Sequence, residues 1–406
     1  MNKSNPQPQR LKQLFVHTSQ GLAGQLTRES QIVFGYRTDD PHCEISLTMP
    51  LRAETYAANI LPGVLRQNLP EGYLLHWIRE RFGKTMKMDD FNILALTGSD
   101  MIGRVSVSLN EKHVEHAKAE DLSALLSWKG SESLFDYLAE KYASTSGISG
   151  VQPKVLAVAY EDKETVDKGI MKDRRLIIKA SGVNYEGLAE NEFHCMTMGM
   201  LAGLNVPKFW LSENKEVFVI ERFDIDPISG EYLGFEDMTA LTGKQNDGKY
   251  DSSYENVAKA LDIFSSSTYK TESLAEFFKS LVLSIAVRNG DAHLKNFGML
   301  YTTPETNDVR LSPLYDIVCT TAYIPRDTIA LKMNKAKAWP SREQLIEFGK
   351  AHCRLDRPVE IIDEVLNVVT AYAPAIETGQ IWKKMQPELV KGAGSLSKPR
   401  SVSPKI

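Results

Sequence analysis

Short apolar stretches alternate with polar and glycine-containing segments over the first fifty residues, a pattern that predicts β-strands. The apolar stretches lie at 14–16, 32–34 and 45–47. From Tyr56 the apolar residues recur near helical spacing, and a further strand is predicted at 103–107. We therefore expect a small N-terminal α/β subdomain over residues 1–130, with the charged stretch after residue 110 as its link to the next domain.

The middle and last parts of the chain have different patterns. Beyond Ser146, strands are predicted at 155–160, 176–179 and 217–220 with a helix at 189–201, which indicates a β-rich lobe over residues 131–235. From Phe235 the apolar spacing is mainly helical, which indicates an α-helical lobe over residues 236–390. Residues 391–406 are rich in Gly, Ser, Lys and Pro and are predicted to be a disordered tail. The predicted fold class is α+β.

Composition narrows the function classes. An apolar content of 42% over 406 residues supports a substantial core, and a net charge of −4 gives no basic excess for direct nucleic-acid binding. The four cysteines form no C-x-x-C pair, so neither a zinc site nor a disulfide framework is indicated. No targeting segment and no run of roughly 18 apolar residues is visible. We therefore expect a cytoplasmic protein without membrane contact.

The strongest chemical signal is the polar loop 288–296, which directly follows an apolar helix predicted at 277–287. Asp291 and Asn296 stand at the spacing that protein-kinase catalytic loops use for their catalytic Asp and magnesium-binding Asn. A carboxylate can orient the acceptor hydroxyl and accept its proton, whereas a neutral amide oxygen binds magnesium without added charge. An ordinary polar turn beside a glycine is the structural alternative. We assign Asn296 to the metal and the loop residues Asp291, His293 and Lys295 to catalysis.

Asp316 follows a second apolar run, where kinases place the Asp of the D-F-G motif, their other magnesium ligand. Here Ile317 and Val318 replace Phe and Gly. We therefore assign Asp316 to metal binding.

Upstream segments are suited to a nucleotide. Lys179 ends a predicted strand and is expected to hold phosphates, with Glu192, or less favourably Glu190, fixing it from the next helix. Glycines before the first strand of this lobe let backbone N–H groups approach phosphates, although such a turn is weak evidence alone. The residues assigned to this loop are Gly147, Ser149, Gly150, Val151, Gln152 and Lys154.

A strand between the lobes ends at 219–224, where a kinase hinge would meet adenine. Asp224 is expected to accept hydrogen bonds from the ribose hydroxyls.

These motifs together resemble those of HipA-type toxin kinases, the kinase half of bacterial toxin–antitoxin pairs. The resemblance covers roughly residues 10–375 and includes Asn68-Leu69-Pro70 and Gly103-Arg104-Val105; its most specific motifs are 150–154, 203–207, 221–224, 291–296 and 315–317. It implies a two-lobed protein-kinase-like fold and serine/threonine kinase activity with ATP and Mg²⁺ as cofactors. By motif, it implies nucleotide contacts for Lys179, Glu221, Phe223 and Asp224, catalysis by Asp291, and magnesium binding by Asn296 and Asp316.

The resemblance also implies regulation and partners. Family members often phosphorylate a serine in the glycine-rich loop, which favours Ser149 here. Gly147 stands where better-known relatives have the modified serine, so Ser146 is the second candidate. The implied partners are a protein substrate, an aminoacyl-tRNA synthetase in some relatives, and a small helix-turn-helix antitoxin of HipB type.

Two other functions remain open from the loop alone. The D-x-H-x-x-N pattern of residues 291–296 is also similar to that of small-molecule and lipid phosphotransferases. An inactive kinase-like binding module is the third reading. The presence of Lys179, Asp291, Asn296 and Asp316 together argues against it, because each has a different electrostatic task in phosphoryl transfer.

Overall fold

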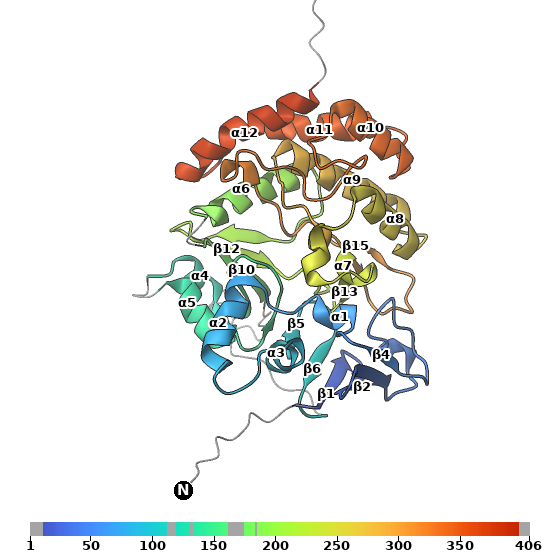
Figure 1. Ribbon diagram of the computed structural model, residues 1–406. Coiled ribbons are helices and arrows are strands. Elements are labelled where there is room, and N and C mark those ends of the chain that lie inside the picture. Colours follow the sequence, from blue (N-terminus) through green and yellow to red (C-terminus); the bar gives the residue numbers. More distant parts are fainter. Residues whose placement is uncertain (1–10, 112–118, 130–132, 161–173, 183–184, 398–406) are drawn as a thin grey trace, which may run out of the picture.

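The computed structural model describes residues 11–111, 119–129, 133–160, 174–182 and 185–397. It has the predicted α+β class. An N-terminal sheet, a central sheet and a helical part follow one another across the molecule, and helix α6 (Leu188–Leu201) lies between the central sheet and the outermost helices (Figure 1). No helix within these ranges is both long and apolar enough to cross a membrane.

The N-terminal subdomain is an antiparallel sheet in the order β4-β3-β2-β1-β6 with its own apolar core. Its elements are β1 (Gln13–Thr18), β2 (Gly21–Arg28), β3 (Ile32–Tyr36), β4 (Tyr56–Ala58), β6 (Ser106–Ser108), η1 (Pro41–Cys43), α1 (Gly63–Arg66), α2 (Gly72–Phe82) and α3 (Asp90–Thr97). The strand predicted at 45–47 does not form. The Leu47 N–H and the Ser46 hydroxyl instead donate to the carboxylate of Glu236 in another part of the fold.

The central sheet has the order β11-β12-β10-β9-β7, antiparallel except for the parallel pair β7 and β9. Its strands and neighbouring helices are β7 (Glu120–Asp121), β9 (Lys154–Tyr160), β10 (Arg174–Ala180), β11 (Phe209–Leu211), β12 (Val217–Glu221), α4 (Leu122–Leu126) and α5 (Leu134–Tyr142). Because β7 belongs to this sheet, the lobe begins before the predicted residue 131. A parallel pair, β5 (Asp100–Met101) with β8 (Ser146–Gly147), joins it to the N-terminal subdomain.

The helical part surrounds α9 (Lys270–Ala286), whose apolar residues at three- and four-residue spacing are buried. Its other elements are β13 (Gly234–Asp237), β14 (Gly298–Tyr301), β15 (Arg310–Leu311), α7 (Met238–Leu241), η3 (Asn246–Tyr250), α8 (Tyr254–Phe264), η4 (Leu294–Asn296), η5 (Thr320–Ala322), α10 (Arg342–Ala351), α11 (Pro358–Ala371) and α12 (Gln380–Leu396). Strand β13 spans the predicted boundary at 235, and its pairing with β14 places it with the helical part.

The disordered tail predicted for residues 391–406 does not begin at residue 391. Helix α12 continues to Leu396 and buries Gly392, Ala393 and Leu396, so its apolar positions are packed although the local composition is polar. The part of the predicted tail from 398 onward lies outside the described residues.

Candidate active site

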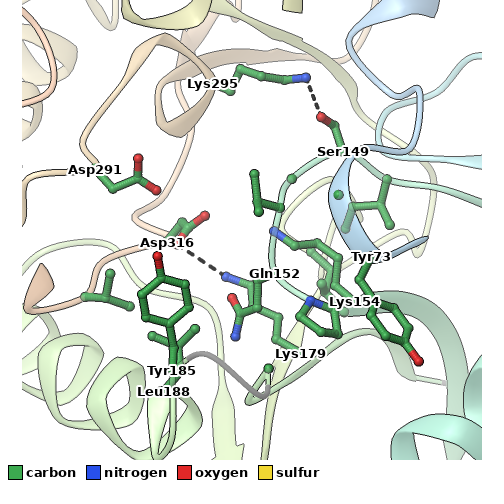
Figure 2. A pocket seen from close by; sticks show the side chains of 18 of the residues that line it. Tyr73, Ser149, Gln152, Lys154, Lys179, Tyr185, Leu188, Asp291, Lys295 and Asp316 are labelled. Carbon is green, nitrogen blue, oxygen red and sulfur yellow. Dashed lines mark hydrogen bonds and ion pairs between the residues drawn. The ribbon is translucent and has the colours of Figure 1, made fainter. Parts of the chain in front are cut away.

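A cavity of about 1000 Å³ lies where the three parts of the molecule meet. Its walls come from the glycine-rich loop before β9, from β10, from the loop after α9 and from residues 315–316. The segment before α2 and the start of α2 add a wall from the N-terminal subdomain. Figure 2 shows Asp291 and Asp316 on one side of the cavity, with Ser149 reaching toward Lys295 from another.

Lys179 lies near the end of β10, and its buried side chain lines the cavity. Its ammonium group donates to the carboxylate of Glu192 and to the carbonyl of Tyr315 at 3.0 Å, and it lies 3.7 Å from Asp316 Oδ1. Burial alone would lower the pKa of Lys179, but the carboxylates of Asp316 and Glu192 raise it. The lysine therefore stays cationic in a poorly solvated place.

The structure distinguishes the two glutamates of α6. Glu192 is fully buried and pairs with Lys179, and burial raises its pKa to about 7 despite that partner. Glu190 instead accepts a hydrogen bond from Gly379 N at 2.6 Å, which ties α6 to the start of α12. The geometry thus places Glu192, and not Glu190, beside the lysine.

The loop after α9 presents Asp291 to the cavity. The chain leaves the helix through Arg288, which has a positive φ of 59°, and the side chain of Asp291 is half exposed. Asp291 Oδ1 accepts a hydrogen bond from the Tyr250 hydroxyl at 2.6 Å and lies 3.9 Å from His293 Nε2. Burial lowers the pKa of His293. The Asn296 side chain accepts from His293 N at 3.0 Å, which closes a short capped turn.

The glycine-rich loop passes over Lys154. Gly150 has a φ of 127°, and a Cβ there would lie 2.5 Å from Lys154 Nζ, so the loop requires glycine at this position. Burial lowers the pKa of Lys154, whereas Asp316 opposes that effect. Ser149 lines the cavity, as do Gly150, Val151 and Gln152.

Several residues predicted for the site lie outside the cavity lining found in the described chain: Ser146, Gly147, Glu192, Glu221, Asp224 and Asn296. Ser146 is buried and donates to the Tyr142 carbonyl at 2.8 Å, while Gly147 is packed in β8 against Met101.

The predicted ribose contact of Asp224 is not supported by this geometry. Asp224 is fully buried, receives hydrogen bonds from Arg222 at 2.9 and 2.6 Å, and accepts from Gly103 N at 2.5 Å. Glu221 forms an ion pair with Arg174. Phe223 does line the cavity and stacks on Tyr315 with ring centroids 4.4 Å apart.

Comparison with known families decides where the chain belongs. Residues 146–373 match the model of the HipA-like C-terminal domain, and residues 14–108 match that of the HipA N-terminal domain. The chain belongs to the HipA-like family.

Named relatives of this HipA-like protein include "Putative kinase Y4dM" of Sinorhizobium fredii, 30% identical over 297 residues that cover 68% of this chain and 67% of the relative. "Putative kinase Y4mE" of the same organism is 25% identical over 74% of this chain and 76% of its own length. The HipA toxin of Shewanella oneidensis MR-1, solved with HipB and operator DNA, matches with a TM-score of 0.65 at 17% identity. The match covers 94% of this chain and 97% of that one, and it confirms the predicted fold.

Sequence reasoning missed part of the site of this HipA-like chain. The cavity is also lined by Gln67, Lys249 and Tyr250. Glu71 does not line it but accepts a hydrogen bond from Ser149, which does. Glu71 adjoins the Asn68-Leu69-Pro70 motif and Tyr250 lies in a polar segment before α8. Neither neighbourhood has a spacing that marks it as catalytic.

Proposed function

We propose that the protein is an ATP- and Mg²⁺-dependent serine/threonine protein kinase of HipA type that transfers the γ-phosphate of ATP to a protein hydroxyl. The observation that carries this proposal is the arrangement of Lys179 between Glu192 and Asp316, with Asp291 facing the same cavity. These groups match the tasks of phosphoryl transfer, in which a lysine neutralises phosphate charge and a carboxylate orients the acceptor.

The residues fit a magnesium nucleotide. Burial alone would raise the pKa of Asp316, but Lys179 and Lys154 lower it, so the carboxylate is ionised. Its side chain is 28% exposed and lines the cavity. Asn296 Oδ1 uses one lone pair on His293 N and keeps a second. Asp316 and Asn296 would hold Mg²⁺, which supplies neutralisation of the charge on the β- and γ-phosphates.

The remaining steps belong to the protein's own groups. Lys179 and Lys154 hold the phosphates, and the stacked aromatic rings of Phe223 and Tyr315 line the cavity. Asp291 orients the incoming hydroxyl and accepts its proton.

Autophosphorylation in the glycine-rich loop belongs to this proposal, and the geometry favours Ser149. Its hydroxyl reaches the cavity, whereas that of Ser146 is buried and bonded to backbone groups. A phosphate there adds about −1.5 to −2 charges near the nucleotide and would repel it. Site-resolved mass spectrometry after incubation with ATP and Mg²⁺ tests this assignment.

The partners we propose are a protein substrate and a small helix-turn-helix antitoxin of HipB type, with the kinase acting in the cytoplasm. The relative solved with HipB and operator DNA supports the antitoxin. An aminoacyl-tRNA synthetase is the substrate class to test first.

The test of the activity compares Asp291→Ala and Asp316→Ala with Asp356→Ala, a matched change at an exposed position outside the cavity. Labelled ATP and Mg²⁺ are supplied, and phosphate on protein is measured. We expect both site variants to lose transfer while Asp356→Ala retains it. Thermal unfolding should be unchanged for Asp291→Ala, whose side chain is half exposed, and lowered but still cooperative for Asp316→Ala, which removes a carboxylate beside buried Lys179. Near-normal transfer by either site variant would refute the assignment.

A further inference from the structure

The glycine-rich loop and the catalytic loop are both tied to one carboxylate of the N-terminal subdomain. Glu71 directly precedes α2, and its Oε1 accepts a hydrogen bond from the Ser149 hydroxyl at 2.7 Å and from Lys295 Nζ at 2.9 Å. Its Oε2 accepts from Lys249 Nζ at 3.0 Å. A single side chain thus joins segments that are 78 and 224 residues away in the sequence.

The backbone beside Glu71 shows that this approach is built into the fold. Gly72 has a φ of 50°, and a Cβ there would lie 2.5 Å from the carbonyl oxygen and 2.6 Å from the Cα of Val151. The start of α2 therefore lies directly against the glycine-rich loop, and only glycine allows this distance.

All three ammonium hydrogens of Lys295 can be used in hydrogen bonds to protein acceptors. Its ammonium group donates to Gln67 O at 3.0 Å, to Glu71 at 2.9 Å and to the Ser149 hydroxyl. An ammonium has three donors and no acceptor, so this arrangement fixes its direction. Two of the three acceptors come from the N-terminal subdomain.

Charge explains why a carboxylate is needed at this place. The side chains of Lys249 and Lys295 are each only 9% exposed, and Glu71 is the acidic partner with which each forms an ion pair. Burial alone would raise the pKa of Glu71, but the two lysines hold it at about 2. Without Glu71, two poorly solvated cations would repel each other and move toward other acceptors.

We propose that Glu71 is a positioning residue for phosphate transfer, which holds the glycine-rich loop and Lys295 in their working places. Glu71 does not line the cavity, so it acts through Ser149, Lys295 and Lys249. The N-terminal subdomain is then part of the phosphotransfer machinery. This inference rests on the proposed kinase activity.

The experiment compares Glu71→Gln, which keeps the shape but removes the charge, with Glu71→Asp, which keeps the charge, and with Glu54→Gln on the exposed surface of the same subdomain. Steady-state transfer gives kcat and the KM for ATP. Hydrogen exchange of residues 146–152 reports how firmly the loop is held. Thermal unfolding shows that each variant folds.

For Glu71→Gln we expect kcat to fall about 10- to 100-fold, the usual loss from small misplacement of reacting groups. The KM for ATP should change less than about threefold. Removing the carboxylate lessens its repulsion of the phosphates, and this offsets the poorer positioning of the lysines. Exchange in residues 146–152 should accelerate. Glu71→Asp should recover part of kcat, and Glu54→Gln should match the wild type.

Unchanged kcat or unchanged loop exchange in folded Glu71→Gln would overturn the inference. A loss confined to thermal stability would assign Glu71 a structural role only and would overturn it too. If the wild type transfers no phosphate, the proposed function fails first. The exchange comparison then still shows whether Glu71 holds the loop.

Discussion

Buried carboxylates compensate buried cations at two places near the cavity. Lys179 pairs with Glu192, and Arg222 pairs with Asp224, whose side chains are almost fully buried. Such pairs keep the charges defined where water is scarce, and removing one partner leaves the other uncompensated. Asp291 differs, because its side chain is half exposed and its described partner at hydrogen-bond distance is the Tyr250 hydroxyl.

Tyr250→Phe tests how that contact affects catalysis. The Tyr250 hydroxyl donates to Asp291 Oδ1 at 2.6 Å, so it occupies part of the carboxylate that is proposed to bind the acceptor hydroxyl. Removing it should free Asp291 and raise acceptor-free ATP hydrolysis by up to about tenfold, the worth of one hydrogen bond to a charged group. Tyr137→Phe, which lies outside the cavity, is the control. A fall in hydrolysis would instead show that the hydroxyl orients Asp291.

The ion pairs of Glu71 predict a pH effect on stability. Lys295 and Lys249 hold the folded pKa of Glu71 at about 2, below its ordinary value of 4.5. A depressed pKa contributes stability above pH 4.5 that is lost as the pH falls toward 2. Urea unfolding at several pH values should give a difference between wild type and Glu71→Gln that is constant near neutrality and shrinks below pH 4.5. A pH-independent difference would contradict this.

At the scale of elements, local apolar patterns predicted β9, β10, β12 and α6 to within two residues at each end. The helix predicted at 277–287 begins earlier, at Lys270, because the first turns of α9 are largely polar. Strand β2 was missed because it contains Gly21 and Gly24, and glycine is more typical of turns than of strand interiors. The predicted strand at 45–47 failed because those residues satisfy Glu236, a partner far away in sequence. Patterns within one segment do not show such tertiary contacts.

Helix α12 illustrates the same limit and gives a test. A Cβ on Gly392 would clash with the carbonyl oxygen of Ala286, at the end of α9 that leads into the catalytic loop. Gly392→Ala should therefore destabilise the protein by about 1–3 kcal/mol through overpacking. Gly394→Ala has open space in the same helix and should stabilise it by up to about 1 kcal/mol. Equal effects in thermal unfolding would show that α12 does not pack there.

At the scale of the whole molecule, the sequence could predict residues whose roles follow from spacing within one segment. Asp291 and Asp316 were found in this way, and the structure places both at the cavity, although their roles remain predictions. Glu71 could not be found, because its three partners come from two other parts of the fold. The ribose contact of Asp224 stays a prediction, and its sequence neighbourhood did not indicate the buried pair with Arg222, which involves the Asp100 and Gly103 segment as well.

Growth of the host tests the proposed activity of the intact protein. If the chain is a HipA-type kinase, its expression in bacteria without an antitoxin should arrest growth. Asp291→Ala should relieve the arrest, because it removes the acceptor-orienting carboxylate from a half-exposed loop position and leaves the core intact. Asp356→Ala, matched in chemistry but outside the cavity, should arrest growth like the wild type. Immunoblots must show equal amounts of the three proteins. Equal toxicity of wild type and Asp291→Ala would mean that growth is inhibited by binding, since the phosphotransfer chemistry would then be dispensable.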